Sequence, residues 1–241
     1  MKSIFSLFLL WAGVYSSFAQ ASYPMLRPTH KYSVKGMSEA SEIVLAADGQ
    51  NVYILADKAY VYKADMQGKK IQKIDVKGYD IEGATLVGDK LYISDENLRQ
   101  VLCYNLSTQT LEKTHQLHYG GGANLGFESI VHLPLSNTFL LASEKSPCVF
   151  HEYSETFQLL NQFQIKGIRE VSALCWYQNN LYVLSDEEAT VYKVDLQKHT
   201  IINAWQVPII NPEGLCFNKQ GEMMIISDDM GKLFVFSNPE Q

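Results

Sequence analysis

The feature that most constrains the fold of this chain is a repeat of about 43 residues. Five short segments of similar pattern recur at intervals of 41, 46, 44 and 41 residues. They begin at Ser41, Glu82, Glu128, Ser172 and Glu213. Repetition at one period along most of a chain indicates stacked copies of one structural unit.

Each repeat has the pattern of four short β-strands. In the last repeat an apolar strand, Leu215–Phe217, is followed by a turn at 218–221 that contains Asn and Gly, and then by a second apolar strand that ends at Asp228. The third strand, Leu233–Phe236, follows. In four repeats a last strand closes the unit, and these segments are Ile71–Val76, Leu111–Leu117, Leu159–Ile165 and Ile201–Val207. Four strands at this period are typical of a propeller blade, so we predict an all-β, five-bladed β-propeller; an open solenoid is the alternative.

The two ends of the chain support a closed ring. The fifth repeat stops after its third strand, and residues 30–36 (HKYSVKG) match residues 72–78 (QKIDVKG) of the first repeat. We therefore expect the N-terminal strand to complete the last blade. Closure of the ring removes sheet edges that would otherwise invite aggregation.

The first residues have the layout of a secretory signal peptide. Lys2 precedes an apolar run, Ile4–Val14, and small residues follow, so cleavage is expected after Ala19 or Ala21. The alternative, a membrane anchor, would need roughly 20 apolar residues. We predict residues 1–19 as the signal peptide and 20–241 as one propeller domain, exported to the periplasm or the cell exterior without a stable membrane anchor.

Composition narrows the classes of partner. The formal net charge is −6 and the basic residues are scattered, which argues against a nucleic-acid-binding face. The four cysteines match no zinc motif, and we interpret Cys175 and Cys216, at equivalent positions of neighbouring repeats, as small core residues. We expect a monomer that binds a small molecule, a glycan or a protein at the channel mouth.

The candidate metal site consists of Glu82, Glu128 and Glu213. The first strand of a blade lines the central channel, so the residues that open these strands should converge at one mouth. Three further acids, Glu39, Asp80 and Glu170, stand two residues before such positions. Carboxylates this close repel each other, and Ca²⁺, which accepts six to eight oxygen ligands, would offset the repulsion. The alternative is that each glutamate hydrogen-bonds the next blade.

Acidic residues also end the second strand of every repeat: Asp57, Asp95, Glu144, Asp186 and Asp228. We interpret these as caps of the following turn, with Glu96, Glu187 and Asp229 as acids that could add to the site at the mouth. The sequence contains no Gly-x-Ser-x-Gly and no His-Glu-x-x-His motif. We interpret His132 as a core histidine.

Several of these motifs resemble the SdiA-regulated protein family. The segments that carry the resemblance are 80–84 (DIEGA), 126–130 (GFESI), 171–174 (VSAL), 181–187 (LYVLSDE) and 211–215 (NPEGL). The resemblance implies an exported bacterial β-propeller of unsettled function with a possible calcium ion. It also supports Glu82, Glu128 and Glu213 as the positions that correspond to the family's motif. The chain departs from the family pattern at Glu42 and Ser129, where glycine is expected.

Three hypotheses of function remain open. The first is a non-catalytic, Ca²⁺-dependent binding propeller. The second is a metal-dependent hydrolase of a phosphate ester or lactone that uses the same carboxylates. The third is a scaffold without metal. The number of protein ligands around the ion would discriminate between the first two, because a hydrolase needs an open coordination position.

Overall fold

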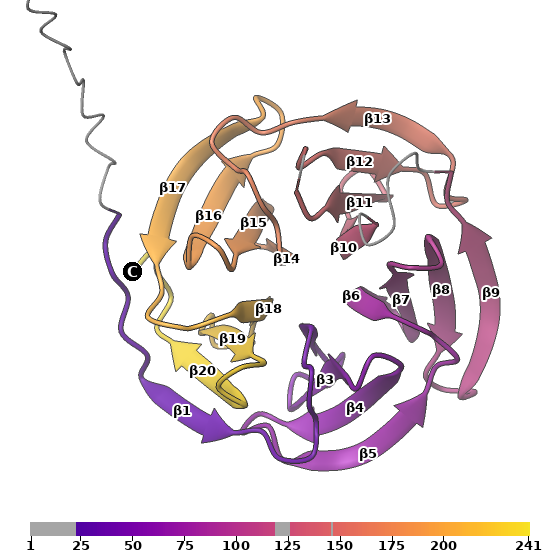
Figure 1. Cartoon of the computed structure of the whole chain (residues 1–241), viewed down its shortest axis with the longest axis horizontal. Coiled ribbons are helices and arrows are strands. Elements are labelled where there is room, and N and C mark those ends of the chain that lie inside the picture. Colours follow the sequence, from indigo (N-terminus) through magenta and orange to yellow (C-terminus); the bar gives the residue numbers. More distant parts are fainter. Residues whose placement is uncertain (1–22, 119–125, 146) are drawn as a thin grey trace, which may run out of the picture.

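The computed structural model describes residues 23–118, 126–145 and 147–241. It contains five four-stranded antiparallel sheets arranged as blades around a central axis (Figure 1). The prediction of an all-β, five-bladed propeller is confirmed. No helix long and apolar enough to cross a membrane occurs in these described ranges. The predicted signal peptide, residues 1–19, lies outside them.

The blades follow one another along the chain, each running from the axis outward. Blade 1 contains β2 (Glu42–Leu45), β3 (Asn51–Ala56), β4 (Tyr60–Asp65) and β5 (Lys70–Asp75). Blade 2 contains β6 (Ile81–Val87), β7 (Lys90–Asp95), β8 (Gln100–Asn105) and β9 (Thr110–Gln116). Blade 3 contains β10 (Phe127–Leu133), β11 (Thr138–Ser143), β12 (Phe150–Tyr153) and β13 (Leu159–Phe163). Blade 4 contains β14 (Ala173–Tyr177), β15 (Asn180–Ser185), β16 (Thr190–Asp195) and β17 (Thr200–Gln206).

Blade 5 is built from both ends of the chain. Its inner three strands are β18 (Pro212–Phe217), β19 (Met223–Ser227) and β20 (Lys232–Phe236). Its outer strand is β1 (His30–Ser33), which pairs antiparallel with β20 from His30↔Val235 to Ser33↔Lys232 (Figure 1). The predicted closure is therefore confirmed. The segment before β1 also pairs with blade 4, where Met25 forms a parallel β-bridge with Gln206.

The core consists of five apolar clusters, and each cluster lies between two neighbouring blades. Alternation along β3 shows how this arises, because Ile54 packs toward blade 5 and Leu55 toward blade 2. Successive side chains of a strand point to opposite faces of its sheet. A blade between two neighbours thus buries both faces, which explains why the inner strands are apolar throughout while the outer strand β5 is mostly exposed.

The four cysteines are free thiols, as the sequence analysis expected for Cys175 and Cys216. Cys216 is buried and Cys175 is half-buried on the neighbouring inner strand. His132 is only half-buried on β10, and its Nε2 lies 2.9 Å from Asn137 Oδ1. The prediction that His132 is a core histidine is therefore only partly confirmed.

Candidate metal centre at one mouth of the channel

The inner strand of every blade starts at the same end of the axis, so the residues that open these strands meet at one mouth. They surround a cavity of about 330 Å³, which we call the acid cavity. Among the described residues, its wall contains eight carboxyl side chains and one cation, Lys58. The acids are Glu39, Glu82, Glu128, Glu144, Glu170, Asp186, Glu213 and Asp228.

All three predicted metal ligands, Glu82, Glu128 and Glu213, line the acid cavity. They come from blades 2, 3 and 5 and are half-buried. In the described part of the chain, none of the three hydrogen-bonds the backbone of the next blade. The two serines at the equivalent positions do: Ser41 Oγ donates to Ile81 O at 3.0 Å, and Ser172 Oγ donates to Pro212 O at 2.9 Å. At these equivalent positions of the described chain, the two serines therefore connect neighbouring blades, and the three glutamates do not.

Three carboxyl groups of blade 2 form the tightest acidic group. One oxygen each from Asp80, Glu82 and Glu96 lies within 4.8 Å of the other two, a spacing that suits a single cation. Within the described residues, this group of three is the one whose oxygens lie close enough to hold one ion. The predicted ligands Glu82, Glu128 and Glu213 share a cavity but do not form such a cluster. Asp80 also accepts a hydrogen bond from Asn97 Nδ2, and Glu96 Oε1 accepts one from Gly126 N at 3.1 Å.

Burial and, to a lesser degree, neighbouring like charges raise the pKa values of Glu82 and Glu213. Desolvation is the main cause of the rise in the pKa of Glu82 to about 8, and the charges of Asp80 and Glu96 add to it. Desolvation likewise raises the pKa of Glu213 to about 7, and the charges of Asp186 and Asp228 add to it. At neutral pH these two side chains therefore favour the protonated form more than ordinary glutamates do, and a bound cation would favour the charged form.

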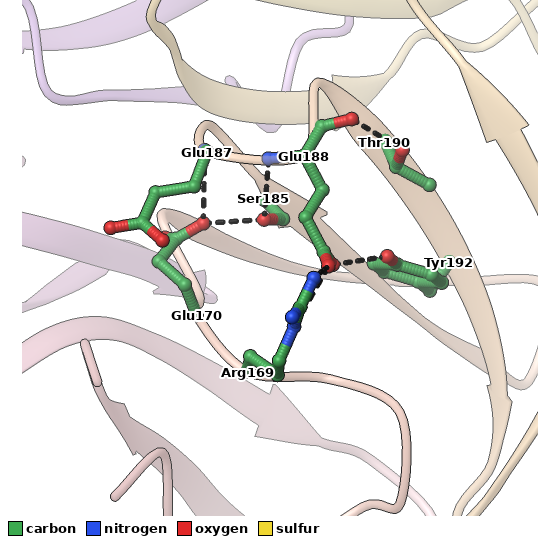
Figure 2. A network of polar contacts seen from close by, with 7 residues as sticks. All are labelled: Arg169, Glu170, Ser185, Glu187, Glu188, Thr190 and Tyr192. Atoms are coloured by element: carbon green, nitrogen blue, oxygen red, sulfur yellow. Dashed lines mark hydrogen bonds and ion pairs between the residues drawn. The ribbon is translucent and has the colours of Figure 1, made fainter. Parts of the chain in front are cut away.

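Glu170 has a structural environment of its own within blade 4 (Figure 2). Its carboxylate accepts hydrogen bonds from the Ser185 hydroxyl and from the Glu187 N–H. Next to it, Arg169 and Tyr192 both contact the carboxylate of Glu188. Burial raises the pKa of Glu170 to about 9. Glu170 thus fastens the segment entering blade 4 to the β15–β16 turn rather than standing free for a ligand.

Three of the five acidic strand ends fasten an entering segment, a role that the capping interpretation did not include. Asp95 caps its own turn through Leu98 N at 3.3 Å, but it also accepts Tyr79 N at 2.8 Å. Asp57 accepts the Ser38 N–H at 3.1 Å, and Asp228 accepts the Ala40 N–H at 3.2 Å. These acids hold the segments that enter the blades, because those segments need partners for their backbone N–H groups.

Lys58 reaches the acid cavity from the turn between β3 and β4. Both Asp57 and Lys58 adopt left-handed backbone conformations, with φ of 53° and 61°. Left-handed conformations also occur at Arg99 and Ala189, in the turns between the second and third strands of blades 2 and 4, so they are a feature of these turns. The Lys58 ammonium lowers the pKa of Glu82, in opposition to the surrounding acids.

A residue that the site prediction missed, Glu42, closes the channel below the acid cavity. Only 1% of Glu42 is exposed, and its Oε1 accepts the N–H groups of Ile43 at 2.9 Å and Leu215 at 3.2 Å. On the other side of the axis, Ser129 Oγ lies 3.5 Å from Glu42 Oε2 and accepts the Leu174 N–H at 2.8 Å. Burial raises the pKa of Glu42 well above its usual range.

This layer explains the two departures from the glycine pattern. The innermost strand of each blade has an unpaired edge facing the axis, and its N–H groups need acceptors. Glu42 and Ser129 supply acceptors to strands of blades 1, 4 and 5. Glycine is required at the neighbouring positions, since a Cβ on Gly83 would lie 2.5 Å from Ser129 Cα and one on Gly214 would lie 2.6 Å from Ile43 N. The signal in the sequence was the glutamate standing where glycine is expected.

Comparisons with known proteins agree with this architecture. A crystal structure of Myxococcus xanthus glutaminyl cyclase superposes with a TM-score of 0.73 at 11% identity, over 88% of this chain and 95% of that one. Two proteins of unknown function are also similar: one from Bacteroides thetaiotaomicron (TM-score 0.60, 16% identity, 83% of this chain and 59% of that one) and one from Bacteroides caccae (TM-score 0.58, 15% identity, 79% and 71%). Identities this low show a shared fold only.

Sequence comparison is more specific. No curated protein matches the chain. The SdiA-regulated family model, however, matches residues 27–239, which span all five blades and the closing strand. The chain belongs to the SdiA-regulated family.

Proposed function

We propose that this protein is a non-catalytic, Ca²⁺-dependent binding propeller that acts outside the cytoplasm. The observation that supports the proposal is the convergence of Asp80, Glu82 and Glu96 oxygens within 4.8 Å, with Glu82 also lining the 330 Å³ acid cavity. Carboxylate oxygens are the ligands that Ca²⁺ prefers. A bound ion would also offset the burial and the neighbouring like charges that together raise the pKa of Glu82.

The arrangement leaves coordination positions open, as a hydrolase would also need, so turnover rather than the number of protein ligands separates the two functions. Three carboxylates supply between three and six oxygens, depending on whether each binds through one oxygen or two, while Ca²⁺ takes about six to eight. The remaining positions would face the acid cavity and the more distant Glu128 and Glu213. A small molecule, a glycan or a protein side chain with oxygen donors would complete the shell, so that the ion links the propeller to its partner.

The test is metal content followed by thermal unfolding. The purified mature chain is freed of metal with EDTA, and its melting temperature is measured with and without Ca²⁺. At free Ca²⁺ a hundredfold above the dissociation constant, binding stabilises the folded state by about 2.7 kcal/mol. For a domain of this size that corresponds to a rise of roughly 5–10 °C in melting temperature.

Two variants locate the site. Glu82→Gln keeps the side-chain size and removes one ligand charge, so the response to Ca²⁺ should be abolished. Glu187→Gln is the control, because Glu187 is an exposed acid near the same mouth that pairs with Lys145 at 3.0 Å. This control should respond like the wild type. If the wild type melted at the same temperature with and without Ca²⁺, the calcium proposal would be wrong and the scaffold hypothesis would be favoured.

The second candidate function is a metal-dependent hydrolase, and Lys58 is the observation that favours it. Among the described residues of the acid cavity, Lys58 is the cation in a wall of carboxyl groups, an arrangement that could stabilise developing negative charge. Glu82, with a pKa of about 8, would be available for proton transfer near neutral pH.

A substrate panel tests this second function. It contains p-nitrophenyl phosphate, a lactone and an N-terminal glutaminyl peptide, the last because one structural neighbour carries the name glutaminyl cyclase. Turnover that requires Ca²⁺ and is lost in Lys58→Met would favour an enzyme. Ca²⁺ binding without turnover of any substrate would favour the binding propeller.

A further inference from the structure

The opposite mouth of the channel holds a second cavity of different character. It has a volume of about 410 Å³ and is lined by the ends of the five inner strands β2, β6, β10, β14 and β18, together with the residues that follow them. We call it the far-mouth pocket. Volumes of this size fall within the range of small-molecule sites, about 300–1,000 Å³.

The layer of Glu42 and Ser129 separates this pocket from the acid cavity. Both side chains are at most 1% exposed and are hydrogen-bonded across the axis. Backbones of neighbouring inner strands approach so closely in this layer that a Cβ at Gly83 or Gly214 would collide with them. The far-mouth pocket is thus a site with its own floor, independent of the proposed calcium site.

The wall of the far-mouth pocket is aromatic and aliphatic. Trp176 and Tyr177 at the end of β14 are half-buried, and the Tyr177 ring stacks on Phe217 of blade 5 with centroids 4.2 Å apart and an interplanar angle of 7°. Val44 and Leu86 line it from blades 1 and 2 and are also half-buried. Flat aromatic faces beside aliphatic side chains favour a planar apolar ligand.

The formally charged side chain among the described residues of this wall is a cation, Lys219, which contrasts with the eight acids of the other mouth. Lys219 extends from blade 5 to blade 1, where its Nζ donates to Asp48 O at 2.8 Å. Its stem passes so close to Gly49 that a Cβ there would lie 2.1 Å from Lys219 Cε. The ammonium is therefore held at the rim, and its remaining N–H groups can donate to an anion.

A hydroxyl group adds a second donor. Thr85 Oγ1 accepts the N–H of His132 at 3.2 Å, and Thr85 is 9% exposed. Its own O–H has no acceptor within the described residues, so it can donate to an oxygen of a bound molecule. One fixed cation, one hydroxyl donor and an apolar wall form the usual composition of a small-molecule pocket.

We propose that the far-mouth pocket binds a planar, aromatic small molecule that carries one negative charge, with the rings against Trp176 and Tyr177 and the anion at Lys219. The site would give the propeller a second ligand on the face opposite the acid cavity. Its occupation needs no metal.

Two fluorescent probes with almost the same ring system test the proposal by calorimetry and fluorescence titration. The anionic probe is 8-anilinonaphthalene-1-sulfonate, and the neutral one is N-phenyl-1-naphthylamine. We expect saturable binding of one anionic probe per chain, unchanged by EDTA. Lys219→Met keeps the stem and removes the charge. It should weaken the anionic probe about three- to fivefold and leave the neutral probe unchanged.

Pocket-filling variants localise the binding. Val44→Phe and Leu86→Phe each add volume inside the pocket and should weaken both probes by about tenfold or more, equivalent to about 1.4 kcal/mol. Ile210→Phe is the control, since Ile210 is 67% exposed and precedes the start of β18 at the acid mouth. Melting curves verify that the variants are folded. Lys219→Met lies at an exposed position, so it remains informative if a filling variant does not fold.

Three outcomes would overturn the proposal. The first is the absence of saturable one-to-one binding of the anionic probe. The second is anionic binding that folded filling variants leave unchanged. The third is an equal effect of Lys219→Met on the charged and the neutral probe.

Discussion

Truncation of Glu42 should cause a large loss of stability, although this residue lies in no predicted site. Glu42→Ala removes the acceptor of two backbone N–H groups, those of Ile43 and Leu215, which face the axis and are 2.9 and 3.2 Å from Oε1. Each buried donor left without a partner costs about 1–3 kcal/mol. The expected loss is therefore about 2–6 kcal/mol, or roughly 5–20 °C in melting temperature.

The matched variant Glu42→Gln separates hydrogen bonding from charge. The amide oxygen can still accept both N–H groups, and the amide NH₂ can donate to Ser129 Oγ, which lies 3.5 Å from the present Oε2. Because burial raises the pKa of Glu42 well above its usual range, a neutral side chain fits this position. Glu42→Gln should therefore stay within about 1 kcal/mol of the wild type.

Urea unfolding followed by circular dichroism at pH 7 provides the measurement. Glu155→Ala, at an exposed loop position, is the control and should not change the free energy of unfolding by more than about 0.5 kcal/mol. If Glu42→Ala were as stable as this control, the axial hydrogen bonds would not contribute to stability and the account of the closed channel would be wrong.

Three further predictions follow from the same geometry. Gly214→Ala should lose about 1–3 kcal/mol in the same urea assay, because its Cβ would lie 2.6 Å from Ile43 N; an unchanged free energy of unfolding would contradict this close approach. In EDTA, the free energy of unfolding should fall as pH rises from about 5 to 8.5, because the pKa of Glu82 is about 8 when folded and near 4.5 when unfolded, so the folded state holds the proton that the unfolded state has lost. Ca²⁺ should reverse that fall, and a flat pH profile in EDTA would contradict the raised pKa. Deletion of residues 30–36 removes β1 and exposes β20 as a sheet edge, so light scattering should detect oligomers; a monomer with unchanged melting temperature would refute the closure by β1.

The acid cavity was only partly predictable. Register within the repeat placed Glu82, Glu128 and Glu213 at one mouth, because equivalent residues of a ring of repeats lie at equivalent heights along the axis. The tightest acidic group arose instead within blade 2, where Asp80 precedes β6 and Glu96 follows β7. Which side chains approach within 4.8 Å depends on backbone turns that the repeat pattern does not specify.

The sequence by itself determined the number of blades, the order of strands and the closing strand, since period-2 alternation and a repeat of about 43 residues leave few ways to bury both faces of each sheet. Only the tertiary structure decided what occupies the axis. Glu42 and Ser129 meet there from blades 1 and 3, and they satisfy N–H groups of strands far away in the chain. Such contacts follow from the distance across a closed ring, and no local pattern encodes that distance. For the same reason the two mouths, one acidic and one aromatic with a single lysine, became separate cavities only when the ring was closed around that layer.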